Sequence, residues 1–234
     1  MNAVGRLRER RAFAALAVLA AVATAHSVDA PPMSADPAAP GTRIWNFRVM
    51  LDGQPIGRHR YSVTPQGERR EVRSDAAFEV RVLGFVAYRY RHQARERWQR
   101  DCLSALDANT DDDGRVSRID AARDDAGLRI TGADGPRVLP GCVLSYAYWN
   151  PAMLTQTRLL NAQTGELDTL RIERVGPGSV DVAGAAVPAV RWRVSGAHAP
   201  IELWYSAQGE WLGLDSTVAG GRRLSYRLDT KENG

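Results

Sequence analysis

The feature that most constrains the fold is an alternation of apolar and charged residues between positions 72 and 98. Over 72–82 the even positions carry apolar or small side chains, and positions 73, 75, 79 and 81 carry charged ones. Over 86–98 most large apolar residues again fall on even positions, and arginines occupy 89, 91, 95 and 97. A period of two is typical of half-buried strands, because successive side chains point to opposite faces. We therefore expect two long strands that pair as a hairpin about Leu83-Gly84.

Shorter strand patterns fill most of the remaining chain. They lie at 43–51 and 56–63, after Cys102, Gly114 and Leu128, and near 166–175, 180–195, 200–206, 210–217 and 222–228. The one helix signal is Asn150, an N-cap residue, followed by Pro151 at the first helical position, which predicts a helix over 151–160. About ten strands and one short helix predict a mainly β fold, either a curved antiparallel sheet or an open β-barrel.

The N-terminus has the three zones of a signal peptide over residues 1–25. Arginines at 6, 8, 10 and 11 precede an apolar, alanine-rich stretch that ends at the small-residue cleavage site Ala23-Thr24-Ala25. The apolar stretch of 12–25 would span about 21 Å as a helix, which is short of the ~30 Å needed for a membrane anchor. We expect a bacterial protein that is periplasmic or secreted after cleavage. Arg10-Arg11 leaves general export and twin-arginine export open.

Residues 26–42 form a Pro- and Ala-rich leader that we expect to be disordered, and 43–230 form a single antiparallel β domain. The chain holds 31 Lys and Arg against 27 Asp and Glu. The signal peptide contains four of the arginines and one acid, so the mature charge is only +1. This balance argues against nucleic-acid binding. No later apolar run is long enough to span a membrane, so we expect no span after processing.

Two cysteines remain in the mature chain, Cys102 and Cys142. An exported protein with this count favours one disulfide, which would close a loop of about forty residues. Two separate buried thiols are the alternative. Two cysteines without a neighbouring Cys or His cannot fill the four positions of a zinc site.

Several short motifs occur in an order that resembles one family. They are Asp52-Gly53-Gln54-Pro55-Ile56-Gly57, the pair Glu96 and Trp98, Tyr148-Trp149-Asn150-Pro151, Leu203-Trp204-Tyr205 and Leu224-Ser225-Tyr226. The chain resembles, over about residues 43 to 229, bacterial exported proteins of domain of unknown function 6134. It is more distantly similar to the family numbered 3108. The resemblance implies a periplasmic β domain, with a curved sheet like that of lipoprotein carriers, and it brings no catalytic residue or cofactor.

A calcium-loop pattern runs from Asn109 to Asp120. Oxygen-bearing residues fall at Asn109, Asp111, Asp113 and Asp120, with glycine at the sixth position, as in an EF-hand loop. The first position is Asn and the last is the shorter Asp, and the segment that follows does not begin a helix. We therefore favour the alternative, an Asp-Gly turn between two strands, and expect no metal.

A group of polar residues falls on the apolar face of the predicted strands. If 65–68 form a loop, His59 lies opposite Ser74, with Ala94 next in line, and His92 and Glu96 share this face. His59, His92 and Glu96 could then perform acid–base chemistry. The chain has no serine-hydrolase, metalloprotease, redox, phosphate-loop or dinucleotide motif, so we assign no catalytic residues and treat the enzyme as the weakest alternative.

Aromatic side chains on the same face suggest a ligand pocket. Its candidate residues are His59, Tyr88, Tyr90, His92, Glu96, Trp98, Tyr148 and Trp149. Large rings of this kind either line an apolar pocket or simply fill a core. The favoured function is a non-enzymatic module that binds an apolar or lipid-like ligand in the cell envelope, with no cofactor. The alternative is a structural protein that contacts another envelope protein through an exposed edge strand. The sequence leaves the ligand, the partner and the oligomeric state open.

Overall fold

The computed structural model describes residues 41–133, 135–196 and 199–233, with the side chain of Asn233 left out. The signal peptide and residues 26–40 of the leader lie outside the described residues. The strands are β1 (Arg43–Leu51), β2 (Gln54–Gln66), β3 (Arg69–Val82), β4 (Phe85–Gln99), β5 (Cys102–Asp112), β6 (Arg115–Asp124), β7 (Gly127–Thr131), β8 (Arg137–Leu139), β9 (Arg158–Leu160), β10 (Leu167–Val182), β11 (Ala185–Gly196), β12 (Ile201–Tyr205), β13 (Trp211–Val218) and β14 (Arg222–Asn233).

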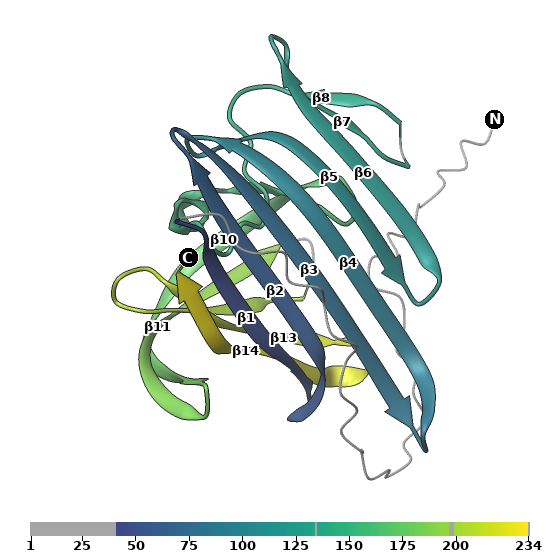
Figure 1. Cartoon of the computed structure of the whole chain (residues 1–234), viewed down its shortest axis with the longest axis vertical. Helices are drawn as coiled ribbons and strands as arrows, with labels where there is room; N and C mark the ends of the chain where they lie inside the picture. The colour runs from purple at the N-terminus through teal and green to yellow at the C-terminus, as the bar shows by residue number, and fades with distance from the viewer. Residues whose placement is uncertain (1–40, 134, 197–198, 234) are drawn as a thin grey trace, which may run out of the picture.

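All fourteen strands belong to one antiparallel sheet, in the order β8-β7-β6-β5-β4-β3-β2-β1-β14-β13-β12-β11-β10-β9. Strands β2 to β6 run side by side across one side of the molecule, and β10 and β13 pass behind them at an angle (Figure 1). The sheet therefore curls on itself, and bulges in several pairs supply local bends. Its edge strands β8 and β9 do not pair with each other in the described part of the chain. The expected curved, open sheet is confirmed, with more strands than the sequence suggested.

The hairpin expected about Leu83-Gly84 is confirmed as β3 and β4. Burial alternates along both strands, as the period of two predicts. Leu83 and Gly84 both have positive φ, 52° and 84°, which is the geometry of a tight two-residue hairpin turn. The even-numbered side chains of 72–80 on β3 and of 88–98 on β4 face the inside of the curl, and we call this side of the sheet the inner face.

Strand β10 corrects the expected break between 175 and 180. It runs without interruption from Leu167 to Val182, through Pro177 and a bulge after Arg174. Only 167–169 of β10 pair with β9, so the rest of that edge is unpaired among the described strands. Proline is tolerated there because an edge position needs no ladder donor. The Gly-Pro-Gly sequence therefore marks an edge and not a loop.

The helix expected over 151–160 is wrong beyond Thr155. Pro151–Thr155 form a single short 3-10 helix, capped by Asn150, whose side chain accepts a hydrogen bond from the Ala152 backbone N–H at 3.1 Å. The chain then becomes extended, because Leu159 and Leu160 are fully buried in strand β9. Among the described residues no helix is long and apolar enough to cross a membrane.

Residues 142–150 run from the start of β5 to the edge strand β9, and we call them the crossing segment. The Cys102–Cys142 disulfide is confirmed and ties the segment to β5, next to a hydrogen bond from the Leu103 N–H to the Val143 carbonyl at 2.9 Å. At the other end, the Leu160 N–H donates to the Leu144 carbonyl at 2.8 Å. The crossing segment thus bridges two distant parts of the sheet and buries side chains inside the curl.

Candidate functional site

The inner face carries two separate apolar clusters. The larger, which we call the main core, contains the fully buried Trp45, Trp98, Leu103 and Trp211, together with much of the crossing segment. The smaller, which we call the open-end cluster, consists of buried Val49, Ala76 and Phe78, with partly buried Ile56, Tyr90, Leu224 and Tyr226 packed against it. Tyr226 packs against both clusters.

Four buried polar residues on the inner face, His59, Ser74, His92 and Thr110, form a polar belt beside the open-end cluster. His59 Nε2 lies 2.7 Å from Ser74 Oγ, and His92 Nδ1 lies 2.8 Å from Thr110 Oγ1. The two histidines are on either side of Ala76, which pairs with both across neighbouring strands. The belt is therefore two hydrogen-bonded pairs joined by a member of the open-end cluster.

The pairing of β2 with β3 differs from the expected one by two residues. His59 lies opposite Ala76, and Tyr61 is the residue opposite Ser74. The turn contains only residues 67 and 68, because Gln66 pairs with Arg69, whereas a loop over 65–68 was expected. A shift of two residues keeps every side chain on its face, so the expected shared face for these polar groups is still observed. Ser74 lies opposite Ala94, as expected.

Burial keeps both belt histidines neutral near pH 7. It lowers the pKa of His92 to about 4, and it lowers the pKa of His59 well below the usual range, with a smaller contribution from nearby His92. The second ring nitrogen of His59, Nδ1, is buried and has no hydrogen-bond partner within the described residues. A buried polar atom without a partner is costly and needs an explanation.

The rings of the open-end cluster are arranged around Phe78. Tyr90 stacks on it with ring centroids 5.1 Å apart, and Tyr226 meets it edge-on at 5.9 Å. Tyr226 also contacts the His59 ring at 5.6 Å. Burial raises the pKa of Tyr90 and Tyr226, so both hydroxyls remain protonated. Both side chains are only partly buried, and neither hydroxyl hydrogen-bonds to another described residue.

Exposure increases along the inner face of β4 towards the hairpin turn. Trp98 is 0% exposed and His92 7%, whereas Tyr90 and Tyr88 are intermediate. The Tyr88 hydroxyl donates to Asp112 at 2.6 Å, and burial together with this carboxylate raises the pKa of Tyr88. The inner face is thus closed at one end and open at the other.

Four of the eight expected pocket residues lie in or against the main core. Glu96 accepts hydrogen bonds from Trp98 Nε1 and Ser145 Oγ, both at 2.8 Å, and burial raises its pKa. Trp149 packs edge-on against Trp98, with centroids 5.4 Å apart. Tyr148 packs against the ring of Trp211, with centroids 5.1 Å apart. His59, Tyr88, Tyr90 and His92 remain as residues of the belt and the open end.

The three residues of the expected acid–base group have separate hydrogen-bond partners. His59, His92 and Glu96 each hydrogen-bond to a different partner, namely Ser74, Thr110 and the Trp98–Ser145 pair. No hydrogen bond links any two of the three among the described residues. Each of the three groups is therefore hydrogen-bonded to a partner other than the two expected to act with it.

The Asn109–Asp120 segment is a hairpin. Asn109 pairs with Arg118 across β5 and β6, and the turn consists of Asp113 and Gly114. Asp111 accepts the Gly114 N–H at 2.7 Å. Asp120 contacts Arg118 at 3.3 Å. The oxygens therefore do not wrap around one ion, and the described residues contain no cluster of His, Cys, Asp and Glu suited to a metal.

A hollow of about 680 Å³ lies on the outer face of β3 to β7. Ala105 and Ala122 pair across its floor, between Arg97 on β4 and Arg129 on β7. None of the expected pocket residues lines it. Because its surroundings include both arginines and carboxylates, this hollow does not fit an apolar ligand.

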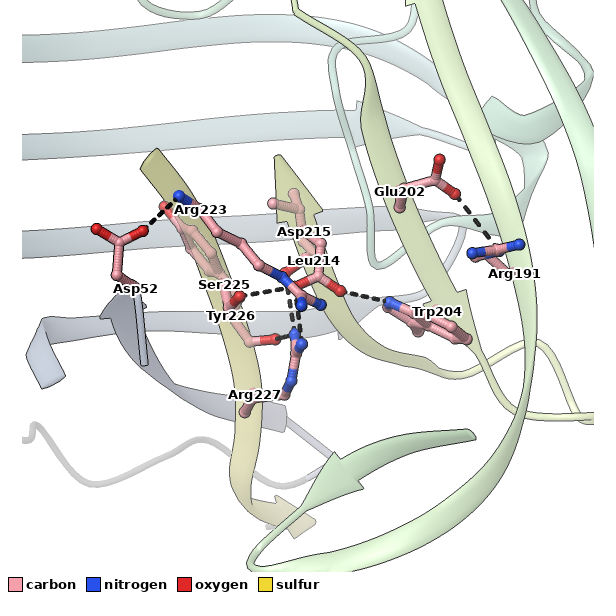
Figure 2. A network of polar contacts seen from close by, with 10 residues as sticks. All are labelled: Asp52, Arg191, Glu202, Trp204, Leu214, Asp215, Arg223, Ser225, Tyr226 and Arg227. Carbon is pink, nitrogen blue, oxygen red and sulfur yellow. Dashed lines mark hydrogen bonds and ion pairs between the residues drawn. The ribbon is translucent and has the colours of Figure 1, made fainter. Parts of the chain in front are cut away.

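A polar network that sequence reasoning missed joins β12, β13 and β14 at Asp215 (Figure 2). Ser225 and Arg227 donate to Asp215 at 2.7 Å, and Trp204 Nε1 donates at 2.8 Å. Burial acts to raise the pKa of Asp215, but these hydrogen bonds outweigh it and the pKa is lowered. Trp204 and Ser225 belong to the family-like motifs, so the network gives those motifs a structural role.

The fold is that of a β-barrel-like, open antiparallel domain. The chain matches the family model described as Domain of unknown function (DUF6134) over residues 47–229, and it belongs to that family. A search of curated proteins finds no match.

Among solved structures, the chain is similar to the "Crystal Structure of Beta-barrel-like Protein of Domain of Unknown Function DUF1849 from Brucella abortus". The two share 12% identity with a TM-score of 0.61, over 83% of this chain and 98% of that chain. At this identity the likeness shows the fold alone.

Proposed function

We propose that this domain is an exported, non-enzymatic binding module that holds an apolar, lipid-like ligand at the open end of its inner face. The observation that carries the proposal is the open-end cluster, in which the rings of Tyr90 and Tyr226 are only partly buried around the buried Phe78, beside the polar belt. Ligand sites typically combine apolar and aromatic walls with a few polar groups. Here Phe78, Tyr90 and Tyr226 supply the walls.

The belt defines the polar end of the ligand. His59 Nδ1 is a buried atom without a partner, and His59 is in ring contact with Tyr226. Both belt histidines are neutral, because burial lowers their pKa values. A buried carboxylate head would lack a compensating charge from the belt. The proposed ligand therefore carries an uncharged polar head, such as an ester or a hydroxyl group, next to an acyl chain.

Native mass spectrometry of the mature protein, purified from its own periplasm, tests the proposal. We expect a native mass that exceeds the denatured mass by a lipid-sized increment. A native mass equal to that of the bare oxidised chain, together with no uptake of a monoacylglycerol probe, would reject the ligand.

A matched pair of variants locates the site. Tyr90→Glu places a charge among the open-end rings, whereas Arg91→Glu changes the next residue of the same strand, which is exposed on the other face. We expect Tyr90→Glu to lower the affinity for a fluorescent monoacylglycerol at least about tenfold, because a buried charge is strongly unfavourable. Arg91→Glu should leave it within about twofold. Equal losses in both variants would argue against this location.

The unpaired edge of β10 supports a second candidate, an edge-strand contact with an envelope protein. Residues 171–182 have no strand partner on this edge among the described strands, and Val175 is 41% exposed. Pro177 and the bulge after Arg174 weaken the edge as a template, because they interrupt the regular row of donors and acceptors. Cross-linking from position 175 to one specific envelope protein would favour this candidate over the ligand.

A further inference from the structure

The β3–β4 hairpin extends beyond both neighbouring strands. Phe78 is the last residue of β3 paired with β2, and Tyr90 is the outermost residue of β4 paired with β5. Beyond them, the ladder pairs of β3 and β4 are only with each other, from Glu79↔Arg89 to Val82↔Phe85, and Arg89 is also hydrogen-bonded to Asp113 of the β5–β6 turn. The three pairs beyond Arg89, at about 3.3 Å each, give a projection of about 10 Å. The projecting hairpin is visible in Figure 1, where its turn reaches past the end of β5.

The end of this hairpin is apolar and exposed. Leu83 is 72% exposed and Phe85 78%, and Val86 follows them at 41%. The other two-residue turns on the same end of the sheet are Asp52-Gly53 and Asp113-Gly114, which have the usual residues for positive φ. Leu83 has the same positive φ of about 50° without such a local reason. Turn chemistry therefore does not account for the exposed leucine.

Charged residues surround the base of the projection, and they balance one another. Glu79 contacts Arg81 at 2.7 Å and Arg89 at 3.1 Å. Asp113 accepts the Arg89 backbone N–H at 3.3 Å, and Asp112 holds the Tyr88 hydroxyl. The surroundings thus have no excess positive charge, and any binding by the tip depends on its apolar side chains.

We infer that Leu83, Phe85 and Val86 insert into the surface of a lipid bilayer. Their exposed parts amount to on the order of 400 Å², whereas a standard protein interface buries about 800 Å² of each partner against a complementary surface. A bilayer needs no complementary shape, and apolar side chains enter its interface with tyrosine and arginine at the headgroup level. Tyr88, Arg81 and Arg89 lie at that level behind the tip.

This contact would also place the proposed site next to its ligand source. Tyr90 and Tyr88 lie on the inner face of the same hairpin, between the belt and the tip. An acyl chain could pass from the bilayer along these rings to the open-end cluster. This route rests on the proposed function, whereas the insertion of the tip does not.

A single labelled cysteine reports insertion directly. Both native cysteines are in the disulfide, so Leu83→Cys creates the one free thiol for an environment-sensitive dye. Val116→Cys is the control, because Val116 is 69% exposed on the adjacent β5–β6 hairpin, which does not project. With phosphatidylcholine vesicles, we expect a blue shift in emission at position 83 and none at 116. No shift at 83, or equal shifts at both positions, overturns the inference.

Vesicle co-sedimentation measures the contribution of the tip. Leu83→Asn with Phe85→Ser removes the apolar side chains, and asparagine tolerates the positive φ. We expect the partition coefficient of the protein between water and the vesicles to fall at least about tenfold in the double variant. Val116→Ser should change this coefficient less than about twofold. Added phosphatidylglycerol or salt should alter wild-type binding less than about threefold, because the charges balance. Binding only to anionic vesicles, or unchanged binding by the double variant, overturns tip insertion.

Probe uptake separates this inference from the proposed function. The double variant should still take up monoacylglycerol from detergent dispersion, because the open-end cluster is unchanged. If wild type binds vesicles through the tip but takes up no probe, the proposed ligand fails and tip insertion stands. If uptake is normal and vesicle binding is absent, tip insertion fails and the proposed ligand stands.

Discussion

The two ends of the inner face are made by the same strands but are covered differently. At the closed end, Trp98 and Leu103 are fully buried beneath the crossing segment. At the open end, Phe78 and Tyr90 belong to a small cluster that includes no residue of that segment. The alternation of the sequence is equally regular at both ends. The comparison therefore teaches that alternation determines which face a side chain occupies, while the rest of the chain determines whether that face is sealed.

The largest expected effect is the removal of a ring from the closed end. Trp98 is 0% exposed, donates to Glu96 and packs edge-on against Trp149. Trp98→Ala should lower the free energy of unfolding by about 4–5 kcal/mol, because it leaves a cavity and removes one of the two hydrogen bonds that the buried Glu96 accepts. Urea denaturation measures this. A loss below about 1.5 kcal/mol would mean that the closed end is not tightly packed.

The next effect concerns the covalent link that holds the crossing segment in place. Replacing both Cys102 and Cys142 by alanine frees a loop of 40 residues in sequence separation. We expect a loss of about 3–4 kcal/mol from the chain-entropy model, measured by thermal and urea unfolding. The backbone amides of the crossing segment should also show a larger increase in hydrogen exchange rate than those of the rest of the sheet. Uniform exchange along the whole chain would contradict a local role for the bridge.

The polar belt should make stability sensitive to acid. The pKa of His92 is about 4 when folded, below its usual 6.5, so the unfolded chain binds more protons between these values. The stabilisation is complete above about pH 6.5 and is lost as pH falls towards 4. We expect wild type to lose roughly 2–3 kcal/mol more than His92→Gln between pH 7 and pH 4. Parallel pH profiles would show that His92 is not buried neutral.

The smallest expected effect is the loss of stability when one tyrosine hydroxyl is removed, compared between the closed and the open end. Tyr205 donates to the Tyr148 carbonyl at 2.8 Å in the main core, whereas the Tyr90 hydroxyl has no partner among the described residues. Tyr205→Phe should cost about 1 kcal/mol, and Tyr90→Phe less than about 0.5 kcal/mol. Paired urea titrations measure both. Equal losses would mean that the open end is as well satisfied as the closed end.

The sequence predicted the regular part of the sheet well. The long hairpin and the disulfide follow from alternation and from the cysteine count in an expected exported chain, and both are observed. It failed where tertiary pairing overrides local signals. Pro177 is typical of a break between strands, but it lies within β10 on an unpaired edge. The helix that begins at Pro151 ends at Thr155, because the chain must be extended for Leu159 and Leu160 to be buried in β9.

The candidate site was only partly predictable for the same reason. His59 and His92 were placed on the correct face, because a two-residue shift in pairing does not change faces. Glu96, Trp98 and Trp149 were grouped with them, since the pattern does not show where the crossing segment lies. The division between closed and open ends depends on contacts between residues far apart in the chain.

The curled sheet also has a consequence for how such domains can diversify. A closed barrel must satisfy a fixed relation between strand number, tilt and stagger, so adding one strand disturbs the whole circle. Here the crossing segment and the Cys102–Cys142 bridge link β5 to the edge strand β9, and no ladder of hydrogen bonds joins the edges β8 and β9 among the described residues. We therefore expect that a strand can be added to or lost from either edge during evolution without changing the curvature of the remaining sheet.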